Sequence, residues 1–410
     1  MNGSGVDNQA PDTAPALRYR IVGSGPVALA CALFMVRGGI DPARIGLRLP
    51  PAGPGTAALP APADGRPPST GQGTRLRRML AISDGSRQLL SRIIAMPPGG
   101  LIERIEVLLA GSTGRTRIEA RDFKIAALGH VIAYPELVAA LRAEVDRLPF
   151  ATVQEDIAHP QEAPSEWIGP VTIHADGMPP QSGTGAKAVR ARDFRQAALL
   201  TEVMAEHPGS TAYECFGRHG PLALLPAGPR HSPRHALVWC DEPEVTAARA
   251  SLPPTQLNAA LNQAVSAIGP PATALGSLQV CAPIEVAPLS RLRRIDLAAG
   301  NEVWIGNAAQ ALHPVAGQGL NLGLRDAFEL ARSLAENEYA ANPVEASLIL
   351  ARFAGRRRLD RGVTTAVTDL LAAAFTWPLA RPVQSALLTT MDLLPPVRRP
   401  LASTLLFGRR

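Results

Sequence analysis

Lysine is almost absent from the sequence, and so are several features that would assign a function class early. Lys and Arg together number 41, yet only Lys124 and Lys187 are lysines, and the formal net charge is +6. Aromatic residues make up 4% of the chain, and no dense basic run carries interleaved aromatics. We interpret the positive charge first as compositional bias and second as a polyanion-binding surface, and we expect no nucleic-acid partner.

Cysteine is scarce, and long apolar runs are missing. The four cysteines, Cys31, Cys215, Cys240 and Cys281, show no close spacing, which predicts buried reduced thiols and neither a metal site nor a disulfide framework. The first residues are polar and lack the apolar core of a signal peptide. No stretch reaches about 18 uninterrupted apolar residues, so we expect a cytoplasmic protein without a membrane-spanning helix.

Length and composition indicate a globular protein of more than one domain. The chain has 410 residues, 46% hydrophobic and 19% charged, which suits two or three domains. A strand, a glycine turn and a helix come first, a strand-rich middle follows, and a strand, a glycine stretch and a helix come late. This order predicts a mixed α/β fold with a sheet-bearing second domain.

Periodicity and turn residues predict the remaining elements. We expect helices over residues 80–93, 134–148 and 254–268, a β-hairpin between 102 and 123, and an irregular segment at 50–73. The region from 190 to 285 otherwise alternates strand-like runs. The tail is expected to be helical and broken by prolines, at Pro378, Pro382, Pro395, Pro396 and Pro400.

The first glycine-rich turn lies in YRIVGSGPVALACALFMVRGG, residues 19–39, between a short apolar strand and an Ala/Leu-rich helix. Gly23 allows a tight turn, and Gly25 lets a pyrophosphate approach the backbone where free amides and the helix dipole favour anions. Ala28 is a tolerated variant of the third glycine. The turn predicts a dinucleotide site; a glycine turn without a ligand is the competing interpretation.

One residue that usually accompanies such a turn is missing. The second strand is expected in RIGLRLP, and an Asp or Glu at its end would hold the adenosine ribose. Leu49 and Pro50 stand there instead, while Asp41 comes too early and Asp64 lies in the irregular segment. This absence lowers the expected affinity for a nucleotide.

The second glycine-rich stretch is GNAAQALHPVAGQGLNLGLRDA, residues 306–327, between a strand and a periodic helix. Gly317 and Gly319 would bring the backbone close to a flat ligand, because two glycines otherwise only weaken a helix start. The amides at that helix start would favour negative charge on the ligand. Gly306 and Asn307, directly after the strand, are expected near the same ligand.

The late stretch closely resembles the flavin-dependent aromatic hydroxylases, in particular their ubiquinone-biosynthesis branch. That branch carries Gly-Asn-Ala-Ala, Leu-His-Pro, Gly-Gln-Gly, Asn-Leu-Gly and Arg-Asp in this order, and the sequence matches through Asp326. RMLAISDGSRQLL resembles a segment whose arginine, here Arg78, approaches the cofactor. HADG, residues 174–177, resembles the Asp-Gly motif associated with the flavin and its nicotinamide donor, and the similarity extends to the C-terminal region.

The resemblance implies FAD as cofactor and an FAD-binding Rossmann-like domain of the GxGxxA type, with a β-sheet substrate domain and a helical C-terminal region. The implied boundaries are 1–16 for a disordered N-terminus, 17–100, 129–185 and 282–350 for the FAD-binding domain, 101–128 and 186–281 for the substrate domain, and 351–410 for the helical region. The implied cofactor-binding residues are Gly23, Gly25, Ala28, Arg78, Asp176, Gly306, Asn307, Pro314, Gly317, Gly319, Leu320 and Asn321. Catalytic side chains are left unassigned, since none need act as a nucleophile, and no metal is implied.

By the same resemblance, the expected activity is FAD-dependent hydroxylation of an aromatic ring. The implied substrate is a polyprenylated phenol on the path to ubiquinone, with a nicotinamide or another electron donor. The apolar segments 370–375 and 387–394, with Trp377 and nearby arginines, suit a membrane surface or partners in a biosynthetic complex. Core packing is the alternative for these segments.

A second function of another class stays open. The missing ribose acid and the altered residues after Asp-Gly, Met178-Pro179-Pro180, suit a protein that keeps the hydroxylase fold but serves as a scaffold. A scaffold would lack flavin.

Several single residues keep two interpretations. Asp176 contacts the flavin or forms a turn. His313 is expected to be structural, and Arg325 and Asp326 are expected to form a local ion pair and a helix cap. The residues that either line an aromatic pocket or pack in the sheet core are Tyr213, Phe216, Leu222 and Leu224.

Overall fold

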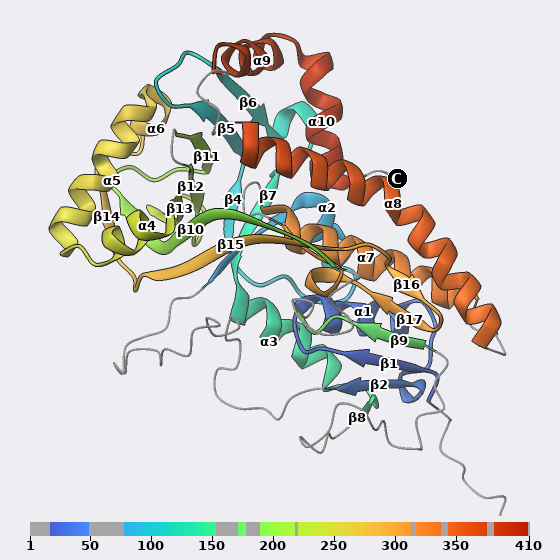
Figure 1. The fold of residues 1–410 in the computed structure, drawn as a ribbon. Coiled ribbons are helices and arrows are strands. Elements are labelled where there is room, and N and C mark those ends of the chain that lie inside the picture. The colour runs from blue at the N-terminus through green and yellow to red at the C-terminus, as the bar shows by residue number, and fades with distance from the viewer. Residues whose placement is uncertain are drawn as a thin grey trace, which may run out of the picture.

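The computed structural model shows a mixed α/β protein with three sheets, as the sequence predicts (Figure 1). The residues that it describes are 17–48, 78–152, 171–177, 189–217, 220–312, 317–337, 343–374 and 381–408. The irregular segment predicted at 50–73, the expected disordered N-terminus, and His313, Pro314, Trp377 and Pro378 lie outside these ranges.

The first sheet has six strands in the order β16-β17-β9-β1-β2-β8. Its strands are β1 (Tyr19–Val22), β2 (Ile45–Arg48), β8 (Ala151–Thr152), β9 (Val171–His174), β16 (Ala298–Ala299) and β17 (Glu302–Trp304). β1 pairs in parallel with β2 and β9, and β9 in parallel with β17. Ile21, Ile173 and Val303 from the three central strands are fully buried in one core. That core also contains α1 (Pro26–Arg37), α3 (Tyr134–Val145) and α7 (Gln318–Ala335).

The second sheet has nine strands and forms the wall of the other half of the molecule (Figure 1). Its strands are β5 (Arg104–Leu109), β6 (Arg115–Glu119), β10 (Val189–Ala205), β11 (Thr211–Phe216), β12 (Pro221–Pro226), β13 (Arg234–Asp241), β14 (Leu278–Val280), β15 (Glu285–Arg294) and β18 (Gln310–Ala311). The long strands β10 and β15 pair with each other and extend toward α7 (Figure 1). The predicted hairpin is β5 and β6, paired antiparallel.

Helices cover one face of the second sheet. They are α4 (Pro243–Ala250), α5 (Pro254–Ile268) and α6 (Pro270–Thr273), and α5 coincides with the helix predicted there. Tyr213, Leu222 and Leu224 share a core with Leu257 and Leu261 of α5. Phe216 packs with Leu109 and Leu388 in another cluster. Sheet-core packing therefore accounts for all four residues whose role was open.

The third sheet corrects one predicted helix. β3 (Met79–Ser83), β7 (Gly129–Ala133) and β4 (Gly100–Ile102) form it in the order β3-β7-β4, and α2 spans only Asp84–Leu90. The helix predicted from residue 80 is therefore wrong over its first four residues. Ser83 caps α2 by accepting the Ser86 amide through its hydroxyl. Pairing of β3 with β7 outweighs the local helical pattern.

The tail is helical, as predicted, but its prolines act differently from one another. α8 spans Pro343–Ala374, α9 spans Arg381–Leu393 and α10 spans Pro395–Phe407. Pro382 and Pro395 lie in first turns, where a missing amide costs nothing. Pro400 lies inside α10, so the break predicted there is wrong. Burial of Ala402 and Leu406 on α10 offsets a proline cost of about 3 kcal/mol.

α9 is fastened to the β5–β6 hairpin. The Ser112 and Ser385 hydroxyls are 2.7 Å apart, and the Arg117 amide donates to Asp392 Oδ1 at 2.9 Å. Within the described part of the chain, no helix is long and apolar enough to cross a bilayer.

The cysteines differ in one respect from the sequence expectation. Cys31, Cys215 and Cys240 are buried and free, but Cys281 is exposed. Burial raises the pKa of the Cys31 and Cys240 thiols to about 12. These two thiols are therefore protonated and unreactive near neutral pH.

Burial of histidine predicts a pH dependence of stability. The His235 side chain on β13 is fully buried, and burial lowers its pKa from the ordinary value of 6.5 against a smaller opposing effect of the Pro233 carbonyl. At a pH near 6, His235 therefore binds a proton more readily in the unfolded chain than in the folded one. The free energy of unfolding falls as the pH drops below about 6.5. We expect the free energy of unfolding, measured in urea from pH 7 to pH 5, to fall by at most about 1.4 kcal/mol per pH unit for this group. In His235→Gln the slope should be smaller; an unchanged slope would contradict the assignment.

Candidate cofactor site

The first glycine turn is built by a close approach of two strand ends. A Cβ on Gly23 would lie 2.4 Å from the Ala175 carbonyl oxygen, and Gly23 has φ +133°, so only glycine fits. Gly25 is the N-cap of α1 and makes no side-chain cap bond, and Pro26 begins the helix. The N-terminus of α1, with its unpaired backbone amides, thus follows directly after β1.

Asp176 lies beside this turn. Its backbone nitrogen would be 2.9 Å from a Cβ on Gly23, and its side chain is exposed. The neighbouring His174 stacks on Trp304 with ring centroids 5.0 Å apart, and the Arg294 guanidinium lies 3.5 Å from the Trp304 ring. These contacts fix the ends of β9 and β17 next to the turn. They do not decide between the flavin-contact and turn interpretations of Asp176.

The second glycine stretch meets the first one. Gly306 has φ +60° and begins a 3-10 turn, Gly306–Ala308, after β17. A Cβ there would lie 3.1 Å from the Val27 side chain. A Cβ on Gly323 of α7 would lie 2.9 Å from Val27 and 3.0 Å from the Gly306 Cα. α1, the Gly306 turn and α7 therefore touch one another, and only small residues permit this.

The start of α7 is locked to β3. Gly317 is the N-cap in the left-handed region, φ +57°, and a Cβ there would lie 3.0 Å from the Ala81 Cβ. Asn321 is buried, and its side chain accepts from the Ser83 amide at 2.9 Å. Its Nδ2 donates to the carbonyls of Ala81 at 3.0 Å and Gly317 at 2.7 Å. Asn321 thus uses its side chain to hold the loop.

Replacing Asn321 with Ala should loosen this start of α7. The change leaves a buried amide and two carbonyls without their partner, so we expect a loss of about 2 to 4 kcal/mol in unfolding free energy and weaker FAD binding. Asn262 is a matched control, since its side chain makes three comparable backbone bonds, two to Leu278 of β14 and one to Asn258 within α5. Asn262→Ala should lose stability but keep FAD affinity, measured by flavin fluorescence titration. Equal FAD affinities in the two variants would contradict the role given to Asn321.

Other predicted residues line or support the open side of these turns. Among the described residues, no atom lies within 4 Å of a Cβ on Gly319 beyond its chain neighbours and its own helix, and Asn307 and Arg78 are exposed. The Arg78 carbonyl accepts from the Tyr134 amide at 2.7 Å, and the Tyr134 hydroxyl would be 3.8 Å from a Cβ on Gly25. Arg78 and Gly25 thus both lie next to Tyr134.

Ala28 and Leu320 face inward. Ala28 is fully buried, and Leu320 packs against the first core. Both side chains pack behind the turns, and Pro314 lies outside the described residues.

The geometry fits an elongated anionic ligand with a flat end. Two helices, α1 and α7, begin side by side without side-chain caps, each from a glycine. Such ends favour phosphate or ring anions through free amides and the helix dipole. β2 ends at Arg48, and Leu49, where a ribose-binding acid is expected, lies outside the described residues.

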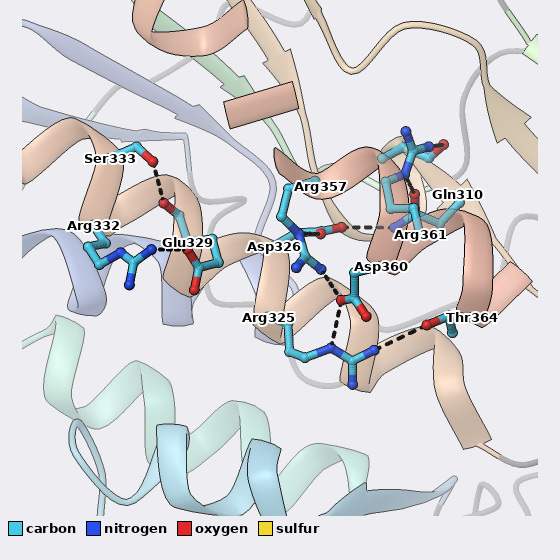
Figure 2. Close-up of polar contacts among 11 residues, drawn as sticks. Gln310, Arg325, Asp326, Glu329, Arg332, Ser333, Arg357, Asp360, Arg361 and Thr364 are labelled. Atoms are coloured by element: carbon cyan, nitrogen blue, oxygen red, sulfur yellow. Dashed lines mark hydrogen bonds and ion pairs between the residues drawn. The ribbon is translucent and has the colours of Figure 1, made fainter. Parts of the chain in front are cut away.

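Sequence reasoning missed the support behind this site, a buried cluster of charged side chains (Figure 2). Asp326 accepts from Arg357 Nε at 2.6 Å, and Arg325 Nε lies 3.2 Å from Asp360 Oδ2. The expectation of a local pair and cap at Arg325 and Asp326 is therefore wrong, because both reach across to α8. A hint was present in α8, where charged residues recur in an otherwise apolar helix.

Comparison with known proteins agrees with this geometry. Residues 181–344 match the family model described as FAD binding domain. The chain is 27% identical over 288 residues to the 3-demethoxyubiquinol 3-hydroxylase of Escherichia coli (strain K12), covering 64% of this chain and 68% of that protein. The chain therefore contains a region that matches an FAD-binding domain, and it is similar to FAD-dependent monooxygenases of the aromatic hydroxylase family.

Two further comparisons give similar proteins of the same kind. The chain is 30% identical over 219 residues to ubiquinone hydroxylase UbiL of Rhodospirillum rubrum, which covers 51% of this chain and 47% of that protein. The solved structure of Klebsiella pneumoniae HpxO, complexed with FAD and uric acid, superposes with a TM-score of 0.64 at 14% identity. That likeness covers 95% of this chain and 97% of the other, and it shows a common fold.

Proposed function

We propose that this monooxygenase hydroxylates the ring of a polyprenylated phenol in ubiquinone biosynthesis, using a nicotinamide as electron donor. The observation that carries the proposal is the meeting of Gly23–Val27, Gly306 and Gly317–Gly323 at two uncapped helix ends. The names of the relatives, ubiquinone and demethoxyubiquinol hydroxylases, support the substrate class.

The side chains and amides of the protein would bind and orient FAD and the substrate, and none of them need take part in a covalent step. The amide ends of α1 and α7 would hold the phosphate and ring portions of FAD, with Gly319 leaving room beside the ring. When bound, FAD supplies electron transfer from the donor and activation of dioxygen for attack on an aromatic ring. Asn307, Arg78 and Asp176 are exposed around the same turns, where they are candidates for polar contacts.

The face of the second sheet opposite its helices suits an apolar substrate. Side chains alternate along a strand, so Leu199 and Trp239 face α5 while Ala198 and Cys240 face away. Ala198, Cys240 and Leu289 form a separate apolar cluster on that second face. We assign this face to substrate contact and to the exclusion of water.

The scaffold function is less well supported. The family match and the hydroxylase relatives favour an enzyme, and the cofactor turns are intact in the structure. Flavin content separates the two functions directly.

The test supplies FAD, NADH or NADPH, and a prenylated phenol beside the same phenol without its prenyl chain, under labelled dioxygen. We expect donor oxidation and a prenylated product that carries one labelled oxygen atom. Flavin binding and donor oxidation without any labelled product would overturn the substrate assignment. A protein that binds no flavin and oxidises no donor would support the scaffold function instead.

The outer face of α9 is proposed to rest on a membrane surface, where such a substrate would be found. Val383 and Leu387 of α9 are 71% and 51% exposed and lie one helical turn apart, while Leu388 is buried on the inner side; Leu394, directly after α9, is 49% exposed. Arg399 on α10 is exposed as well. The side chains of residues 370–375 and of Arg410 lie outside the described part, so α9 carries the proposal.

Replacing Leu387 with Glu should remove vesicle binding. We expect co-sedimentation with anionic phospholipid vesicles to drop at least about fivefold, since burying a charge in the interface opposes binding. Leu348→Glu, on an equally exposed leucine of α8 (54%), is the matched control and should bind vesicles like the parent. Loss in both variants, or in neither, would contradict a surface located on α9.

A further inference from the structure

Gln310 links the segment after the Gly306 turn to helix α7. It follows the Gly306–Ala308 turn in β18, and its side chain is 1% exposed. Its Nε2 donates to Asp326 Oδ2 on α7 at 2.9 Å, and its Oε1 accepts from Arg361 Nε on α8 at 2.5 Å (Figure 2). The amide can satisfy both partners at once only in this orientation.

α8 closes the same cluster from the other side. Arg357 donates to Asp326 Oδ1 at 2.6 Å and to Asp360 Oδ2 at 2.7 Å. Arg361 Nη2 lies 3.4 Å from the carbonyl oxygens of Ala309 and of Arg294. α8 therefore binds both strand β18, which follows the Gly306 turn, and helix α7, which starts after Gly317. We call Gln310, Asp326, Arg357 and Arg361 the Gln310 clamp.

Stability alone is a poor reason for this cluster. Buried ion pairs lose in desolvation much of what they gain in attraction, and apolar side chains of similar volume often serve stability as well. Three arginines, Arg325, Arg357 and Arg361, face only two carboxylates, Asp326 and Asp360, and all five are buried. Arg361 takes a neutral amide as its acceptor, and burial lowers its pKa to about 10. What such directional bonds do supply is a fixed geometry.

We propose that the Gln310 clamp positions the cofactor-binding turns, by setting the spacing between Gly306 and the start of α7. Gln310 is then a positioning residue for FAD that touches no cofactor atom. The proposal rests on the proposed cofactor site, and it adds that α8 takes part in holding the cofactor. The first glycine turn, Gly23–Ala28, is not tied to the clamp by any of these bonds.

The test separates the two ends of the cofactor. In Gln310→Met the two bonds are lost while the length of the side chain is kept, and the dissociation constants for FAD and for ADP are measured on the flavin-free protein. We expect FAD binding to weaken about tenfold or more, with ADP binding within about twofold of the parent, because the ADP half would use the first turn. Arg356→Gln is the matched control: Arg356 also joins α8 to α7, at 2.9 Å, but its partner is Ser333, about two helical turns along α7 from Asp326. It should leave both constants unchanged.

Two results would overturn the proposal. One is FAD binding by Gln310→Met within about twofold of the parent. The other is an equal loss of FAD and ADP binding, which indicates general disruption. If Gln310→Met does not fold, Arg361→Lys takes its place, because lysine keeps the charge but lacks the planar guanidinium that bonds to Gln310. FAD binding like that of the parent in Arg361→Lys would overturn the proposed positioning role of the clamp. If the parent protein binds no FAD, the proposed cofactor site is wrong. If the parent and its variants bind FAD equally tightly, only the role of the clamp is wrong.

Discussion

Gly319→Leu should abolish FAD binding while leaving the flavin-free protein as stable as the parent. The position is open on the side assigned to the cofactor, since no other part of the described chain lies within 4 Å of a Cβ there. A leucine side chain would fill that space without a clash, and exchanging glycine for leucine favours the helix by up to about 1 kcal/mol. We expect the dissociation constant for FAD to rise at least about a hundredfold, or roughly 2.7 kcal/mol.

Gly362→Leu is the control for Gly319→Leu. Gly362 lies inside α8, and of the residues that the structure describes none outside its own helix lies within 4 Å of a Cβ there either. The control should show a similar gain in melting temperature with unchanged FAD affinity, measured by fluorescence titration. If Gly319→Leu bound FAD like the control, the space beside Gly319 would not be the cofactor site.

Asp326→Ala should destabilise the protein more than any other single change considered in α7. Asp326 is fully buried and accepts from both Arg357 and Gln310. Its removal leaves the Arg357 guanidinium buried with a single carboxylate, Asp360, that Arg325 also uses. Breaking a buried pair from one side typically costs about 3 to 5 kcal/mol, and we expect a loss in that range from urea unfolding of the flavin-free protein.

Glu329→Ala is the matched change on the same helix. Glu329 pairs with Arg332 at 2.7 Å, but the arginine is 47% exposed, and exposed pairs contribute about 0.5 kcal/mol or less. Its variant should unfold within that margin of the parent. A loss below about 1 kcal/mol for Asp326→Ala would show that the buried cluster is not coupled to folding as the structure indicates.

The sequence predicts the elements whose signals are local. α3 and α5 follow from apolar periodicity and a proline in the first turn, and the β5–β6 hairpin follows from two strand-like runs around a glycine-rich turn. The two glycine turns were recognisable for the same reason, since left-handed or crowded backbone at Gly23 and Gly317 admits little else.

Features that depend on distant partners could not be predicted in this way. Leu80–Ser83 has a helical local pattern but pairs with β7, some distance along the chain. Asn321 is bonded to Ser83 across 238 positions, and Arg325 to Asp360 across 35. Tyr213 alternates correctly as a strand residue, yet only the placement of α5 shows that its face is the covered one.

The most direct measurement of the central claim is the visible absorption spectrum of the purified protein after addition of FAD and removal of the excess. We predict the two visible bands of a bound flavin in the parent and their absence in Gly319→Leu, because the paired helix ends at Gly25 and Gly317 hold the cofactor. A parent protein that stays colourless after this treatment would contradict the cofactor site and the hydroxylation proposed for it.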